Sequence, residues 1–212
     1  MVFSTSRCLS ADKKDALLLY SKAVANYQDG DLLSAIETFK KVVSLAPNHP
    51  IAWNDLGRAY FGLNRNEEAI AAFEQQIKVN KSSLFAYNNL GLALEAEKRY
   101  EEAEQAYKKQ FQFSPDDPWA HRNLARVALL RKEYELAGRE FQRVIEITPN
   151  EPNVHVSLAD LYLQVGHPEK AFPEMDRAIE LSPTPHVWNT LCLNRILFPQ
   201  RICLPQFVSA RG

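Results

Sequence analysis

Residues 50–83 of this chain read PIAWNDLGRAYFGLNRNEEAIAAFEQQIKVNKSS. The first half of this stretch carries an apolar stripe with the spacing i, i+3, i+4, i+7, made of Trp53, Leu56, Gly57 and Tyr60. The second half carries another stripe, made of Ala69, Ile70, Phe73 and Ile77. This spacing is typical of one face of an α-helix, and the polar run 64–66 between the stripes is typical of a turn. The stretch therefore predicts two amphipathic helices joined by a turn.

The same pattern recurs along the chain with a period of 34 residues. One column of the repeat holds Ala35, Ala69, Ala103, Ala137 and Ala171, and a second holds Phe39, Phe73, Tyr107, Phe141 and Met175. A third holds Leu56, Leu90, Leu124 and Leu158, and a fourth, with small residues only, holds Ala23, Gly57, Gly91, Ala125 and Ala159. Pro115, Pro149 and Pro183 close successive periods. Small residues in register let two helices approach closely, so each period is predicted to be a packed helical pair.

Composition limits the kind of partner. Of the 212 residues, 46% are hydrophobic and 24% are charged, as in ordinary folded domains, and the net charge of -1 gives no general attraction to nucleic acid or anionic membranes. No run of 18 apolar residues predicts a membrane span. Three cysteines form no disulfide framework, and no secretory signal is visible near the N-terminus, so we expect a cytoplasmic protein.

The motif W-x2-L-G-x2-Y followed by A-x3-F, which residues 53–73 contain without a substitution, resembles the tetratricopeptide repeat family. The resemblance implies an all-α, right-handed superhelical solenoid of five helix-turn-helix repeats plus a terminal helix, eleven helices in total. The expected segments are an N-terminal extension over 1–15, repeats over 16–49, 50–83, 84–117, 118–151 and 152–185, and a C-terminal capping or interface helix and tail over 186–212.

The resemblance also implies a concave groove lined by the first helix of each repeat. The predicted peptide-binding residues are Asn54, Arg58, Phe61, Phe85, Asn88, Asn89, Trp119, Arg122, Asn123 and Arg126. The remaining groove positions, which are not part of this set, hold Tyr20, Ser21, Val24, Asp55, Leu92, Leu129, Val156, Ser157 and Asp160. An asparagine amide can pair with a peptide backbone unit, and an arginine can hold a carboxylate in a bidentate fork. We therefore expect a protein partner that offers an extended segment with acidic residues.

Comparison with two groups within the family refines the expectation of a peptide-binding groove. Asn89 and Asn123 resemble two rungs of the asparagine ladder in O-linked N-acetylglucosamine transferases. The carboxylate clamp of chaperone-binding members is matched by Asn89 alone, so recognition of a chaperone tail is not expected.

The sequence predicts no enzyme, no cofactor and no metal site. Neither G-x-S-x-G nor H-E-x-x-H is present. His121 and His155 share a column with Trp53 and Tyr87, which indicates a packing position rather than a pair of metal ligands.

The C-terminal segment suggests a different role. Residues 186–198 predict a helix without a second helix to cover its apolar residues, among them the predicted self-association residues Trp188, Leu191, Ile196, Leu197 and Phe198. Exposed apolar patches mark interfaces, so we expect a homodimer, with a fold-back of 199–212 and an unstructured tail as alternatives. The first four repeats also resemble the tails of bacterial transglutaminase-like proteins, which leaves open a repeat tail of a larger enzyme.

Overall fold

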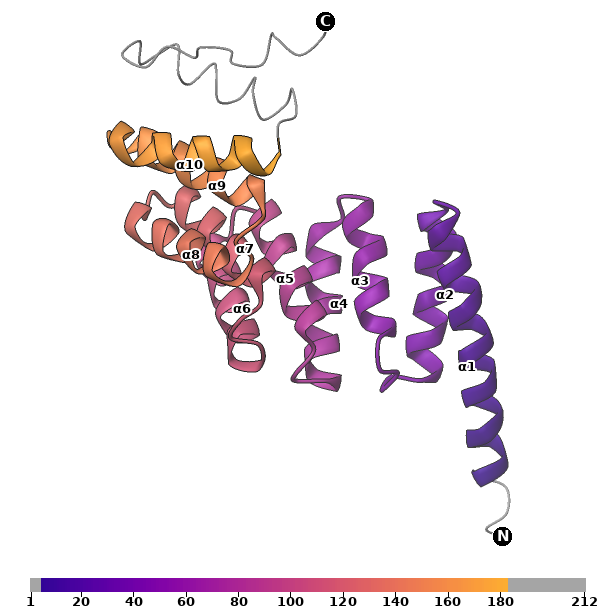
Figure 1. The fold of residues 1–212 in the computed structure, drawn as a ribbon. Helices are drawn as coiled ribbons and strands as arrows, with labels where there is room; N and C mark the ends of the chain where they lie inside the picture. The colour runs from indigo at the N-terminus through magenta and orange to yellow at the C-terminus, as the bar shows by residue number, and fades with distance from the viewer. Residues whose placement is uncertain (1–4, 183–212) are drawn as a thin grey trace, which may run out of the picture. The chain divides into compact units, whose positions relative to one another are not determined.

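The computed structural model describes the backbone of residues 5–182 and the side chains of residues 13–182. Within that range the chain forms ten α-helices and no strand, which confirms the all-α fold (Figure 1). The helices are α1 Thr5–Gln28, α2 Leu32–Leu45, α3 Ala52–Gly62, α4 Asn66–Val79, α5 Leu84–Ala96, α6 Tyr100–Phe113, α7 Pro118–Leu130, α8 Tyr134–Ile147, α9 Pro152–Gln164 and α10 Pro168–Leu181. The predicted eleventh helix, over 186–198, lies outside the described residues.

The described part of the chain divides into two compact units, one that ends at Ala120 and one that begins at His121. In the first unit each helix from α1 to α5 packs on the helix that follows it, and in the second unit α9 packs on both α8 and α10. Helix α7 begins in the first unit and continues in the second. The N-terminal part of α1 includes residues 5–15, while the predicted division into an extension, five repeats and a C-terminal segment stays a prediction.

In each helical pair, the turn between the two helices contains one residue whose backbone is in the left-handed region of φ and ψ. These residues lie 34 apart and are Gly30, Asn64, Lys98, Lys132 and Gly166, with φ of 82°, 58°, 59°, 62° and 82°. At each turn the next backbone N–H donates to a carbonyl five residues back, as Arg99 does to Leu94 at 2.9 Å. This bond is the outer bond of a Schellman motif, which ends the first helix and starts the second.

Polar residues begin the second helix of several pairs. The Asp31 carboxylate accepts the backbone N–H of Ser34 at 3.1 Å. Hydrogen bonding by the Ser34 side chain, followed by this backbone bond, lowers the pKa of Asp31. Glu67 and Glu68 lie in the first turn of α4, where the helix dipole favours negative charge.

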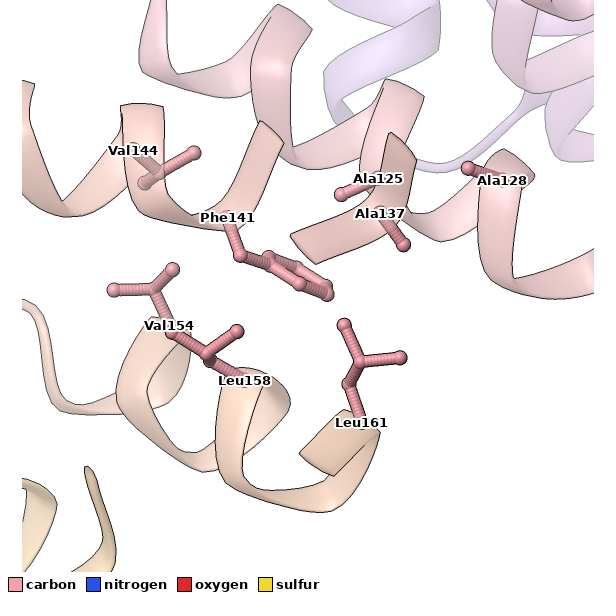
Figure 2. Close-up of a cluster of buried hydrophobic side chains, with 8 residues drawn as sticks. All are labelled: Ala125, Ala128, Ala137, Phe141, Val144, Val154, Leu158 and Leu161. Atoms are coloured by element: carbon pink, nitrogen blue, oxygen red, sulfur yellow. The ribbon is translucent and has the colours of Figure 1, made fainter. Parts of the chain in front are cut away.

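The predicted columns form the core. All five alanines of the first column are buried, and so are the five large residues of the second. In the second unit Phe141 extends from α8 toward Leu158 and Leu161 of α9 (Figure 2). Leu90 differs from the other leucines of its column because it stays half-buried.

Gly57 and Gly91 allow helices to pack closely. A Cβ atom on Gly57 would lie 2.5 Å from the Phe73 ring, and one on Gly91 would lie 2.4 Å from the Tyr107 ring. No side chain fits at such distances, so the Phe73 and Tyr107 rings pack directly against the backbone of these two glycines.

Candidate peptide-binding surface

Three of the predicted asparagines meet in the first unit. The Asn89 amide on α5 donates to Asn54 Oδ1 on α3 at 2.9 Å, and the Asn88 amide donates to Asn89 Oδ1 at 3.4 Å. We call these three residues the amide row. The row joins two first helices of neighbouring repeats, because Asn54 and Asn89 occupy nearly the same place in the period.

A buried glutamine holds the α3 end of the amide row. Gln76 on α4 is fully buried; its Nε2 donates to the Pro50 carbonyl at 2.7 Å, and its Oε1 accepts the Asn54 backbone N–H at 3.2 Å. The Gln76 side-chain amide therefore supplies an acceptor for one of the first N–H groups of α3, which have no acceptor within the helix. These two bonds of Gln76 tie the backbone that carries the Asn54 side chain to α4.

Asp55 extends the polar surface to α1. Its carboxylate accepts the Tyr20 hydroxyl at 2.6 Å and lies 3.4 Å from Arg58 Nη1. The Asn54 amide donates to the same carboxylate at 3.5 Å, which links Asp55 to the amide row. Burial, followed by the bond to Asp55, raises the pKa of Tyr20, so the hydroxyl keeps its proton.

A cavity of about 400 Å³ opens beside this cluster. It is lined by Tyr20, Val24, Tyr27, Gln28, Phe39, Ile51, Asp55 and Arg58. The Arg58 guanidinium lies 5.0 Å from the centre of the Tyr27 ring, which adds a cation–π contact to its ion pair with Asp55.

The predicted set misses Tyr20, Tyr27 and Asp55. Tyr20 and Asp55 fall on groove positions, so column position alone could have added them. Their mutual bond, between residues 35 apart in the chain, could not be read from the sequence.

Exposed aromatic rings lie on the predicted surface of the first unit. Phe85 on α5 is 78% exposed, Trp119 at the start of α7 is 63% exposed, and Phe61 on α3 is 36% exposed. Rings of this size are the residues that most often anchor a bound polypeptide.

The other predicted residues lie in the second unit. Arg122 on α7 forms an ion pair with Glu151, and Arg126 donates to Asn123 Oδ1 at 3.3 Å. Arg122, like Arg58, therefore faces a carboxylate of its own chain. The five predicted self-association residues, from Trp188 to Phe198, lie outside the described part of the chain.

The two histidines of the packing column have partners that the sequence analysis did not predict. His121 Nδ1 lies 2.7 Å from Glu140, and His155 Nδ1 lies 2.6 Å from Glu174. Both histidines are buried, and each carboxylate comes from the second helix of the same pair. Glu140 and Glu174 are themselves 34 residues apart, and this spacing is the sequence signal that could have predicted them as partners of the two histidines. Within residues 13–182, no three potential ligands come together in an arrangement that could hold a metal ion.

Three models of the tetratricopeptide repeat match four segments of the chain. One matches residues 54–118, a second matches 94–155, and a third matches both 16–49 and 152–185. A comparison with curated proteins found no match.

Several solved structures share the fold at low sequence identity. A MamA protein is 21% identical, with a TM-score of 0.74 over 79% of this chain and 92% of that chain. MamA 41-end from Desulfovibrio magneticus RS-1 is 19% identical, with a TM-score of 0.74 over 80% of this chain and 96% of that chain. YrrB, described as a TPR protein with an unusual peptide-binding site, is 18% identical, with a TM-score of 0.72 over 92% of this chain and 100% of that chain. None of the ten described helices has the length and apolar character needed to cross a bilayer.

Proposed function

Because the chain belongs to the tetratricopeptide repeat family, we propose that it is a non-catalytic interaction scaffold that binds an extended segment of another protein. The observation that carries the proposal is the amide row on α3 and α5, Asn54, Asn88 and Asn89. The binding surface proposed in the first unit consists of this row, the exposed ring of Phe85 and the cavity beside Asp55.

The amide row has the chemistry that a peptide backbone needs. In the described part of the chain, the Asn89 side chain donates one hydrogen bond to Asn54 and accepts one from Asn88. A carboxamide has two N–H donors and two acceptor lone pairs, so Asn89 keeps one of each. A peptide unit also offers one donor and one acceptor, and it can pair with Asn89 in both directions.

Side chains of the bound segment have apolar places to pack. Phe85 presents a largely exposed ring, and Val24, Phe39 and Ile51 line the cavity of about 400 Å³. YrrB shows that a similar fold in another protein has a peptide-binding site.

Arg58, the cation of this surface, gives only a limited preference for acidic segments. It already pairs with Asp55, just as Arg122 of the second unit pairs with Glu151. An acidic group of the ligand must compete with Asp55 for the Arg58 guanidinium group. We propose that backbone pairing dominates, that affinity is micromolar, about -8 kcal/mol, and that added salt weakens the binding of acidic segments by screening.

The test is a peptide-display selection on the full chain, followed by titration of the enriched peptides. Asn89→Ala is expected to weaken binding about five- to thirtyfold, since it removes one or two hydrogen bonds worth about 1 kcal/mol each. Gln112→Ala is the matched control, because Gln112 is an exposed amide on α6 that bonds to Lys109. Equal affinity of the Asn89→Ala protein and the wild type would refute the amide row as the binding site.

Self-association through residues 186–198 is a second proposal. It rests on the apolar pattern of that segment, including Trp188, Leu191 and Phe198.

A further inference from the structure

A second cavity lies in the other unit, away from the amide row in sequence. It has a volume of about 450 Å³ and is formed by α8, α9 and the start of α10. The residues that decide its chemistry are Tyr134, Gly138, Arg139, Tyr162, Val165 and Lys170. We call it the Gly138 cavity.

The cavity coincides with a change of side chains at two repeat positions. Gly138 is 68 residues, or two periods, after Ile70, which is buried. Leu161 on α9 is likewise two periods after Ala93. Ile70 and Ala93 thus correspond to Gly138 and Leu161, and a Cβ atom on Gly138 would only touch Leu161 Cδ2, at 3.5 Å. Both Gly138 and Leu161 line the cavity.

The mouth of the cavity also differs from its equivalent in the first unit. There, the Asn66 amide donates to Glu97 at 2.7 Å and links α4 to the turn after α5. Two periods later, the same positions hold Tyr134 and Val165. An aromatic ring and a branched apolar side chain therefore replace a polar bridge, and both line the cavity.

Two cations lie at its rim. Arg139 is exposed and has no ion-pair or hydrogen-bond partner among the described residues. The Lys170 ammonium group lies 5.8 Å from the centre of the Tyr162 ring. The opposing charge in the lining is Glu135, while His167 contacts Glu169 at 3.0 Å. One carboxylate against two cations leaves the rim positive.

We propose that the Gly138 cavity binds an aromatic side chain of a partner protein whose next residue is acidic. Tyrosine walls favour a flat ring, and the volume lies in the range of specific ligand pockets. The acidic neighbour pairs with Arg139 at the rim. This site is separate from the amide row, so neither proposal depends on the other.

The test uses three blocked hexapeptides titrated into the full chain, with amide chemical shifts followed by NMR. The central pairs are phenylalanine–glutamate, phenylalanine–lysine and alanine–glutamate. The first is expected to shift the Gly138 amide and its neighbours in a saturable way, and the other two are expected to bind at least about fivefold more weakly. Equal binding of all three peptides, or shifts confined to residues far from Gly138, would overturn the proposal.

Variants with counterparts elsewhere in the chain separate binding from folding. Gly138→Ile combined with Leu161→Ala restores the Ile70 and Ala93 pair and fills the cavity. Tyr134→Asn combined with Val165→Glu restores the Asn66 and Glu97 bridge and closes the mouth. Each double variant that melts cooperatively is expected to lose the shifts of the residues that neighbour position 138, and Arg139→Gln is expected to remove the preference for glutamate over lysine. A folded double variant that binds like the wild type would show that the cavity is not the site.

Discussion

Gly57 and Gly138 are both helical glycines, but their surroundings differ. The Phe73 ring occupies the place of a Gly57 side chain, whereas Leu161 leaves room for a methyl group on Gly138. Gly57→Ala is expected to destabilise the protein by about 1–3 kcal/mol through overpacking, and Gly57→Leu by more. Gly138→Ala is expected to stabilise it by about 0.5–1 kcal/mol, because alanine favours a helix interior over glycine. Urea unfolding of both variants measures this difference, and two equal effects would contradict the packing described.

Lys132 carries backbone strain at the turn between α7 and α8. Its φ is 62°, and the equivalent residues Gly30 and Gly166 are glycines. A Cβ atom costs about 1–2 kcal/mol in this region, so Lys132→Gly is expected to raise the free energy of unfolding by about 1 kcal/mol. Lys132→Ala keeps the Cβ atom and should leave stability nearly unchanged, as thermal melting can show. An equal rise with alanine would mean that the lysine side chain, and not the backbone, is unfavourable.

At the scale of an element, α3 begins on a titratable group. His49 Nδ1 accepts the Ala52 backbone N–H at 3.2 Å, and its ring centre lies 4.5 Å from that of Tyr20. Burial lowers the pKa of His49 below 6.5, against a smaller opposing effect of Asp55. The unfolded chain therefore binds this proton more readily than the folded chain. The His49 contribution to stability is complete above about pH 6.5 and is lost as the pH falls through the lowered pKa.

His49→Asn tests this contribution, because asparagine keeps an acceptor at the helix start but does not titrate. Unfolding free energies measured between pH 7.5 and 5 should fall more steeply for the wild type than for the variant. Parallel pH curves would show that protonation of His49 does not affect the start of α3.

At the scale of the whole molecule, the segment after α10 governs the predicted self-association. Residues 186–198 carry Trp188, Leu191, Ile196, Leu197 and Phe198, and a two-fold pairing is the commonest way to cover such a patch. Light scattering is expected to give a dimer for the full chain and a monomer for a chain that ends at Pro185. Monomers of equal stability in both samples would exclude the dimer.

The period of 34 residues by itself determined the helices, the pairing and the core. It could do so because equivalent residues of each repeat occupy equivalent places in the helical pair, so a column such as Ala35 to Ala171 predicts one buried position five times. The same periodicity placed Asn54 and Asn89 on neighbouring helices. The left-handed turn residues also form a column, but a lysine at two of its five positions hides the usual glycine signal.

Only the tertiary structure decided which polar groups pair and where space remains. Asp55 bonds to Tyr20 on α1, Gln76 bonds to the start of α3, and Arg122 faces Glu151, each across helices that no local pattern relates. The Gly138 cavity depends in the same way on Leu161, which extends from a different helix. A period specifies where backbones lie, whereas the direction of each side chain and the volume left between them depend on the particular residues that meet there.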